Sequence, residues 1–333
     1  MRIGIFLAET SPRGSTLEEV VAKARWAEEN GLATGWVPHV PWSHDALTSL
    51  ALAGQRTSRI ELGTAVVPTW SRHPYGLAQQ ALSTQAACGG RLLLGIGPSH
   101  QMVAEGWYGA SYAGVIHHVR DYVGVLEACF AAQAEANTGA RGPGDVGAPV
   151  HFAGERYRVE SLLDVPGATP VPIYLAALAP LMLRLAGERA AGTITWMGDE
   201  RTHAEHVLPR LEAAARAAGR PTPRVIAGLP VTVCDDAAEG RAAADRRYTI
   251  YQQIPTYARM LARGDAKSPA DVSVVGSEAQ VAARLRSYAS AGVSDLCAMV
   301  FGVGSDAAAR ARSRQRTEQC LAALARETAP SAG

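Results

Sequence analysis

Residues 60–97 read IELGTAVVPTWSRHPYGLAQQALSTQAACGGRLLLGIG and decide the fold class. The apolar run Ile60 to Val67 has the length of a buried strand, and so does the run Arg91 to Ile96. Between them, Pro74 to Ala87 has helical spacing, and the proline after His73 takes the first helical position, where no backbone N–H is needed. Strand, helix and strand in this order predict a βαβ unit with parallel strands.

The same alternation continues in both directions along the chain. Six further strand-like runs each lead to a predicted helix: Arg2 to Ala8, Thr34 to Val37, Val171 to Ala176, Gly192 to Trp196, Arg224 to Val233 and Ser294 to Phe301. Eight such units over about 250 residues or more predict a single (β/α)8 TIM barrel. It would cover residues 1–333, with an insertion at about residues 98–170 that holds a helix near 115–136 and a hairpin at 150–159. A doubly wound sheet is the alternative, but the first strand-to-helix turn lacks its G-x-G-x-x-G pattern.

Charge and composition restrict the function classes. With 32 basic and 31 acidic side chains in 333 residues, the formal net charge is +1, which indicates no nucleic-acid partner and no acidic tail. No stretch of about 18 apolar residues occurs, and the first segment is too short and too soon acidic for a signal peptide. We therefore expect a cytoplasmic protein with no membrane contact. The five cysteines are widely spaced, which argues against disulfides and against a zinc site, so no metal is expected.

The chemistry of a (β/α)8 barrel lies at the C-terminal ends of its strands. Most residues that follow the predicted strands are apolar or aromatic, and the plausible ionisable groups are Glu9, His39 and His100. A metal-dependent hydrolase would need several carboxylates or histidines at this end. An apolar mouth instead suits a flat organic cofactor that carries the difficult chemistry itself. The side chains expected to face the substrate are Trp42, Trp70, Trp196 and His100.

Two segments at strand ends have the small residues that let backbone donors approach a phosphate. One is Leu94 to Ser99, which contains two glycines and a hydroxyl. The other is Ala176 to Pro180, which ends a strand and opens a helix whose first amides point toward the mouth. Either segment could instead simply turn the chain.

The motifs around this central stretch resemble those of the bacterial luciferase-like superfamily. They are Gly63 to Pro68, Arg72-His73-Pro74, Leu77 to Gln80 and Gly89 to Gly97, with supporting pieces at Ile3 to Leu7, Ala27 to Gly31, Pro172 to Ala177, Leu185 to Gly187 and Ala291 to Asp295. Within the superfamily, the chain is most similar to the oxidoreductases that use the deazaflavin coenzyme F420. Members that use FMN share the same scaffold, so FMN is the alternative cofactor.

The resemblance implies positions for the cofactor. The family's often cis peptide in the third strand, which backs the cofactor ring, would fall at Ala65-Val66. Gly97, Pro98 and Ser99 match the family segment beside the cofactor, and Ala176, Ala177, Leu178 and Ala179 match the loop that meets its phosphate. This loop often reads Ala-Ala-Gly-Gly in the family, and here Leu178-Ala179 replace the glycines.

Two residues are candidates for the catalytic proton transfer. Relatives with a catalytic histidine commonly read Val-x-Asp-His before Pro-Trp, whereas this chain reads Val37-Pro38-His39-Val40-Pro41-Trp42. Counted from the strand, His39 takes the place of the aspartate; counted back from Pro41-Trp42 with one deletion, it is the histidine. Glu9, at the end of the first strand, is the other candidate.

These observations predict an F420-dependent oxidoreductase that transfers hydride between deazaflavin C5 and a C=N, C=C or C=O bond of a small organic substrate. The alternatives are an FMN-dependent luciferase-like monooxygenase and a non-catalytic flavin-binding barrel. The resemblance also implies a homodimer. The sequence does not identify the substrate or the direction of hydride transfer.

Overall fold

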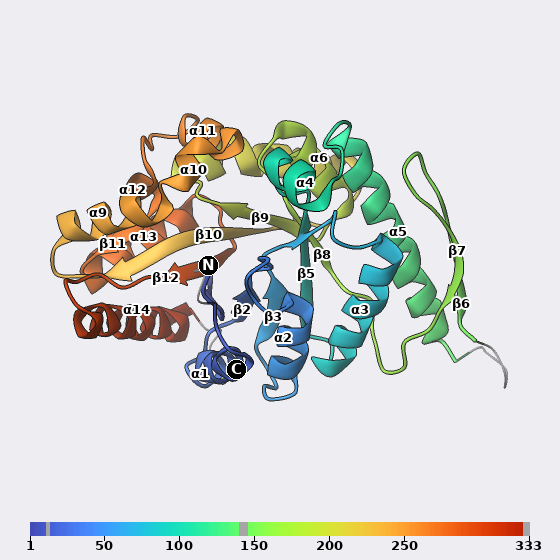
Figure 1. Cartoon of the computed structure of the whole chain (residues 1–333), viewed down its shortest axis with the longest axis horizontal. Helices are drawn as coiled ribbons and strands as arrows, with labels where there is room; N and C mark the ends of the chain where they lie inside the picture. Colours follow the sequence, from blue (N-terminus) through green and yellow to red (C-terminus); the bar gives the residue numbers. More distant parts are fainter. Residues whose placement is uncertain (11–13, 140–145, 329–333) are drawn as a thin grey trace. The chain divides into compact units, whose positions relative to one another are not determined.

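Parallel strands alternate with helices along most of the chain in the computed structural model (Figure 1). The structure describes residues 1–10, 14–139 and 146–328. They form two compact units, the first within residues 1–7, 26–36 and 177–333 and the second within residues 8–25 and 37–176. That all 333 residues act as one barrel domain stays a prediction.

The strands of the first unit are parallel. β1 (Arg2–Phe6) pairs with both β2 (Thr34–Val37) and β12 (Asp295–Val300), and Gly4 lies opposite Thr34 on one side and Cys297 on the other. The long strand β10 (Arg224–Val233) pairs with β12, β9 (Gly192–Trp196) and β11 (Val274–Gly276). Nine of its ten residues are buried, as expected for a parallel strand that is covered on both faces.

Helices follow the strands of the first unit. They are α6 (Pro180–Arg189), α7 (Glu200–Thr202), the π-helical turn η1 (His203–Val207), α8 (Leu208–Ala217), α9 (Ala237–Tyr248), α10 (Ile250–Gln253), α11 (Pro255–Leu261), α12 (Pro269–Val272), α13 (Glu278–Ser290) and α14 (Ala307–Thr328). The start of α13 is fixed by a capping box between Ser277 and Gln280, which satisfies two amides that would otherwise lack partners.

Within its described residues, the second unit has four parallel strands and five helical segments. β5 (Leu92–Gly97) pairs with β3 (Glu61–Thr64), β4 (Val67–Pro68) and β8 (Ile173–Ala176). Its helices are α2 (Ala46–Gly54), α3 (Pro74–Ala87), α4 (Gln101–Tyr108), α5 (Val115–Ala136) and the first part of α1 (Leu17–Glu29). The start of α1 is fixed by two reciprocal hydrogen bonds, because the Glu19 amide donates to Thr16 Oγ1 and the Thr16 amide donates to the Glu19 carboxylate.

An antiparallel hairpin projects from the second unit beside α5 (Figure 1). Its strands are β6 (Ala148–Ala153) and β7 (Arg158–Leu163), so the predicted hairpin at 150–159 exists and is longer than expected. Phe152 packs against Gly124 of α5, where a Cβ would lie 2.3 Å from the phenyl ring. Part of the predicted insertion, residues 140–145, lies outside the described residues.

The eight predicted strands are present, with corrections in detail. The run Ile60 to Val67 is divided into β3 and β4, and β11, α4 and α12 were not predicted. These three elements have three to eight residues, which is too few for a clear hydrophobic period. All five cysteines are buried and free of disulfides, as expected. Among the described residues, no helix combines the length and the hydropathy that a bilayer crossing requires.

Candidate active site

Three of the segments expected to hold a cofactor come together in the second unit. The peptide between Ala65 and Val66, which joins β3 to β4, is cis, at the position that the resemblance implied. Gly97 at the end of β5 is tightly enclosed, because a Cβ there would lie 2.8 Å from Ala176 Cβ and 3.2 Å from Val66 Cγ2. Residue 97 therefore has no room for a side chain, and backbone alone occupies the point where β4, β5 and β8 end.

The segment after β5 is held by two aromatic side chains. Trp70 Nε1 donates to the carbonyl of Pro98 at 2.6 Å, and the Tyr112 hydroxyl donates to the carbonyl of Ser99 at 3.2 Å. Ser99 has a φ of 56°, in the left-handed region that non-glycine residues rarely adopt. His100 follows it at the N-cap of α4, and burial lowers the pKa of its imidazole. Hydrogen bonds from Trp70 and Tyr112 thus fix the backbone of this segment in an unusual conformation.

The two predicted aromatic substrate contacts of this unit lie in different surroundings. Trp42 is 46% exposed, its indole N–H donates to the carbonyl of Thr10 at 3.1 Å, and its ring meets Trp107 edge-to-face. Trp70 is largely covered, because its indole stacks on the imidazole of His118. Trp42 is therefore the more accessible of the two to a ligand.

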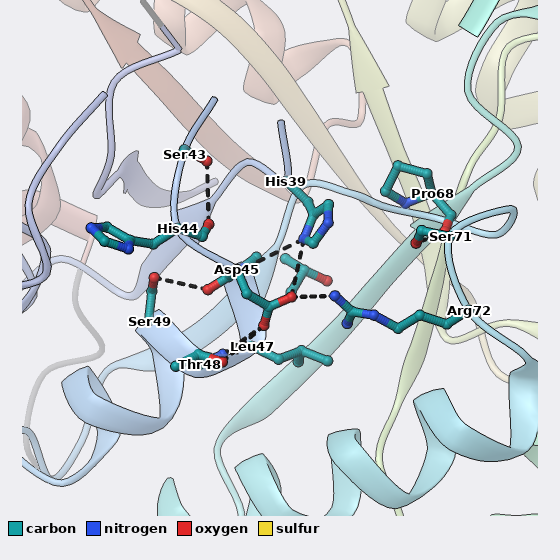
Figure 2. A network of polar contacts seen from close by, with 12 residues as sticks. His39, Ser43, His44, Asp45, Leu47, Thr48, Ser49, Pro68, Ser71 and Arg72 are labelled. Atoms are coloured by element: carbon teal, nitrogen blue, oxygen red, sulfur yellow. Dashed lines mark hydrogen bonds and ion pairs between the residues drawn. The ribbon is translucent and has the colours of Figure 1, made fainter. Parts of the chain in front are cut away.

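His39 belongs to a polar network at the N-terminus of α2 (Figure 2). Its Nδ1 accepts from the Ala46 amide at 3.4 Å and lies 3.6 Å from Asp45 Oδ2. The guanidinium of Arg72 donates to the same carboxylate oxygen, and Gln80 Nε2 donates to Oδ1 at 3.2 Å. Figure 2 shows His39, Asp45 and Arg72 pointing toward one another, while His44 points away.

Burial and charge act on the His39 imidazole in opposite directions. Burial lowers the pKa of His39, the Asp45 carboxylate works to raise it, and the Arg72 guanidinium lowers it further, with a net decrease. The pKa of Asp45 is also lowered, because its hydrogen bonds from Thr48 and Arg72 outweigh the effect of burial. His39 is therefore a neutral imidazole beside an ionised carboxylate near neutral pH.

Glu9, the other candidate for proton transfer, is exposed after the end of β1. Its backbone amide donates to Ser15 Oγ at 3.0 Å. An exposed carboxylate is less well suited to proton transfer than a partly buried imidazole, because water competes for every contact it makes.

Of the predicted phosphate loop, Ala177, Leu178 and Ala179 lie in the first unit, as does Trp196. His206, in the π-helical turn η1, donates from Nε2 to the carbonyl of Leu178 at 2.8 Å. In this loop Leu178 and Ala179 replace the glycines of the family pattern, and they allow fewer backbone conformations than glycine. The His206 side chain fixes the backbone of the loop at Leu178. Trp196, at the end of β9, contacts an aromatic cluster made of Phe6, Tyr248 and Tyr251.

Comparison with known proteins identifies the family. The luciferase-like monooxygenase family matches residues 1–295 of the chain. The chain belongs to this family. The resemblance inferred from the sequence motifs is therefore confirmed.

Curated relatives of this luciferase-like protein include F420-dependent enzymes. It is 31% identical over 236 residues to an F420-dependent glucose-6-phosphate dehydrogenase of Nakamurella multipartita, which covers 67% of this chain and 65% of the relative. It is also 31% identical over 179 residues to a protein of Mycobacterium tuberculosis named putative coenzyme F420-dependent oxidoreductase, with coverages of 50% and 47%. The chain thus spans between about half and two thirds of the length of these relatives.

Solved structures share the fold over almost the whole chain. The F420-dependent tetrahydromethanopterin reductase of Methanopyrus kandleri has a TM-score of 0.73 at 19% identity, covering 98% of this chain and 97% of its own. An EDTA monooxygenase of a Chelativorans species has a TM-score of 0.75 at 17% identity, with coverages of 97% and 94%. At these identities the likeness concerns the fold alone, and the predicted luciferase-like (β/α)8 barrel is confirmed.

Sequence reasoning missed several residues of this luciferase-like site. Asp45 was not considered, although an aspartate directly before an apolar helical run is a typical N-cap signal. Tyr157, whose hydroxyl lies 3.3 Å from His118 Nδ1, was missed because the two residues are 39 positions apart in the sequence. His206 was missed because it is 28 positions from Leu178. No pattern in the sequence places these residues beside the predicted site.

Proposed function

We propose that the protein is an F420-dependent oxidoreductase that acts on a C=N, C=C or C=O bond of a small organic substrate. The observation that carries this proposal is the 31% identity over 236 residues to an F420-dependent glucose-6-phosphate dehydrogenase. The chemistry of the site agrees with it, because its strand ends carry small and aromatic residues, which suit a flat organic cofactor.

The residues of the second unit suit a flat ligand. Ala65 and Val66 present small side chains beside Gly97, where a side chain would collide with Ala176 and Val66. We assign Ala65, Val66, Gly97, Pro98 and Ser99 to the binding of the ring and its tail. In the loop after β8, the expected phosphate contacts are Ala176, Ala177, Leu178 and Ala179. When bound, F420 supplies or accepts a hydride at C5 and leaves the proton to be moved by the protein.

His39 is the residue proposed to move that proton. Its contacts with Ala46 and Asp45 both use Nδ1, so Nε2 is the atom that can exchange a proton with the substrate. Glu9 is the alternative proton donor. His100, Trp42, Trp70 and Trp196 are proposed to shape the substrate site, and excluding water there would protect a hydride in transit. We further propose a cytoplasmic homodimer.

An equilibrium titration of the purified protein with F420 and with FMN tests this function. We expect saturable binding of F420 and none of FMN at the same concentrations. Reduced F420 added under anaerobic conditions with a panel of cyclic imines and enones should then be oxidised, and the absorbance of oxidised F420 should appear, only when a substrate is present. Binding of FMN with oxygen-dependent turnover would support the monooxygenase alternative, and cofactor binding without turnover over the whole panel would support the binding-protein alternative.

A further inference from the structure

Asp45 has two carboxylate oxygens with different surroundings. Oδ1 accepts from the Thr48 amide at 2.9 Å, from the Thr48 hydroxyl at 3.1 Å and from Gln80 Nε2 at 3.2 Å. These bonds cap α2 and fix the orientation of the carboxylate. Oδ2 faces Arg72 and lies 3.6 Å from His39 Nδ1. Oδ1 thus caps helix α2, and Oδ2 lies between the Arg72 guanidinium and the titratable imidazole of His39.

His39 Nδ1 can use either of two partners in this arrangement. When Nδ1 accepts from the Ala46 amide at the start of α2, the neutral ring carries its proton on Nε2. When Nδ1 carries a proton, the ring is a cation with Asp45 Oδ2 at 3.6 Å from Nδ1. The helix N-terminus opposes a positive charge on the ring, whereas the carboxylate favours it. The protonation of His39 therefore depends on the balance between these groups.

Arg72 changes this balance from the far side of the carboxylate. Arg72 lies between β4 and α3 in the sequence, and its guanidinium donates to Oδ2 and to Gln80 Oε1, the latter at 2.7 Å. Its positive charge offsets part of the negative charge of Asp45, and the carboxylate therefore stabilises a protonated His39 less. Among the described residues, Asp45 and Arg72 are the charged groups that act on His39, and His44 points away from it (Figure 2).

We propose that Asp45 and Arg72 are positioning residues with opposite effects on the protonation of His39. Asp45 favours the protonated ring and Arg72 the neutral one, and together they set whether Nε2 can give a proton to the substrate or take one from it. The inference rests on the proposed function only in that it assigns the proton of that reaction to His39. In alcohol oxidation Nε2 takes the proton of the alcohol while Nδ1 keeps its own, and Asp45 stabilises the imidazolium that results. In reduction the imidazolium gives its Nε2 proton to the reduced bond, and Arg72 favours the neutral ring that remains. Neither residue needs to touch the substrate for this effect.

The titration of His39 in the cofactor-free protein tests the proposal directly. The ring of His39 is assigned in two-dimensional ¹H–¹⁵N NMR spectra by comparison with a His39→Gln variant, and its midpoint and tautomer are followed between pH 4.5 and 9. Asp45→Asn keeps the helix cap, because asparagine is as good an N-cap as aspartate, but it removes the charge. We expect its His39 midpoint to fall by about 0.5 to 1 pH unit. Arg72→Gln should raise the midpoint by a similar amount.

Three further variants keep the test decisive. Asp236→Asn changes another aspartate N-cap, at the start of α9, and should leave the His39 midpoint unchanged. Arg72→Lys keeps the positive charge and should stay closer to the wild type than Arg72→Gln does. If Asp45→Asn fails to fold, Asp45→Ser supplies another good N-cap without a charge. Shifts in the same direction for Asp45→Asn and Arg72→Gln, or no shift in either, would overturn the proposal.

The same variants separate this inference from the proposed function. F420 titrations should give dissociation constants within about threefold of the wild type, because the proposal gives neither residue a contact with the cofactor. In turnover experiments, the part of the pH–rate profile that depends on the protonation of His39 should shift by the same amount as the NMR midpoint. The variants should change kcat more than KM. Absence of F420 binding in the wild type would reject the proposed function and leave the His39 titration result intact.

Discussion

The imidazole of His118 lies parallel to the indole of Trp70, with ring centroids 3.7 Å apart and an angle of 6° between the planes. His118 Nε2 is 2.9 Å from Thr69 Oγ1, and Nδ1 is 3.3 Å from the hydroxyl of Tyr157 in the hairpin. Either hydroxyl can donate or accept, so a neutral imidazole satisfies both contacts. His118 thereby joins the turn after β4, helix α5 and the hairpin of the second unit.

This arrangement predicts a loss of stability in acid. Burial, helped by the Arg156 charge and opposed by Asp121, lowers the pKa of His118 from 6.5 to about 4. Between these two pH values the unfolded chain binds a proton that the folded chain does not, so protonation favours unfolding. The contribution of His118 is complete above pH 6.5 and is lost as the pH falls toward 4. After allowance for solvent screening, we expect it to be about 2 kcal/mol.

Denaturant unfolding of the wild type and of His118→Gln at pH 7, 5.5 and 4.5 measures this contribution. Glutamine can hydrogen bond to both hydroxyls but does not titrate. The free energy of unfolding of the wild type should therefore fall more steeply than that of the variant. Parallel pH dependences of the two proteins would contradict the prediction. The comparison is needed because His39, His100, His203 and His206 also have lowered pKa values.

The strands and the residues at their ends could be predicted because each depends on a local pattern. β2, β9 and β10 have the predicted bounds, since runs of apolar residues between glycines or polar turns have few alternatives as buried parallel strands. His39 closely follows β2 and Gly97 ends β5, so both were placed at strand ends without any knowledge of side-chain contacts. Residues whose place depends only on where the barrel strands end can therefore be predicted from the sequence.

The polar partners of the site could not be predicted in this way. The carboxylate of Asp45 meets Arg72 27 residues later and Gln80 35 residues later, so the network exists only after α2 and α3 have packed. Trp70 illustrates the same limit. Its place after the third strand suggests a substrate contact, and the structure shows that one face of its indole is occupied by His118. Its predicted contact with substrate stays a prediction.

Gly97→Ala should reduce both stability and cofactor binding. The added methyl would lie 2.8 Å from Ala176 Cβ, so β5 and β8 must separate at the point where the cofactor is expected. Overpacking of this kind costs about 1 to 3 kcal/mol, and we expect F420 binding to weaken at least tenfold. Gly106→Ala is the matched control, because a Cβ at this helical position has no atom within 4 Å. The control should keep F420 binding and gain up to about 1 kcal/mol of stability. Equal behaviour of the two variants in isothermal titration and thermal unfolding would contradict the prediction.

His206→Ala should weaken F420 binding by releasing the loop that contains Leu178. The hydrogen bond from Nε2 to the Leu178 carbonyl fixes a segment that lacks the glycines of the family pattern. Its loss should raise the dissociation constant about fivefold to tenfold, because one hydrogen bond contributes about 1 kcal/mol. His206→Gln, whose amide can donate to the same carbonyl, should recover part of the affinity. If alanine and glutamine variants bind F420 as tightly as the wild type, the loop does not depend on this contact.

His39→Ala should slow turnover while it leaves cofactor binding nearly unchanged. A positioned acid or base contributes about 10²- to 10⁴-fold to a proton transfer. The ring uses Nδ1 for its own network, and Nε2 is the atom that we propose to act on the substrate. We therefore expect kcat to fall by at least about 100-fold and the dissociation constant for F420 to stay within about threefold. Glu9→Gln is measured in parallel, since it removes the competing acid with little change in shape. A large loss of kcat in Glu9→Gln together with a normal rate in His39→Ala would contradict the prediction and assign the proton transfer to Glu9. Normal rates in both variants would show that neither residue supplies the proton.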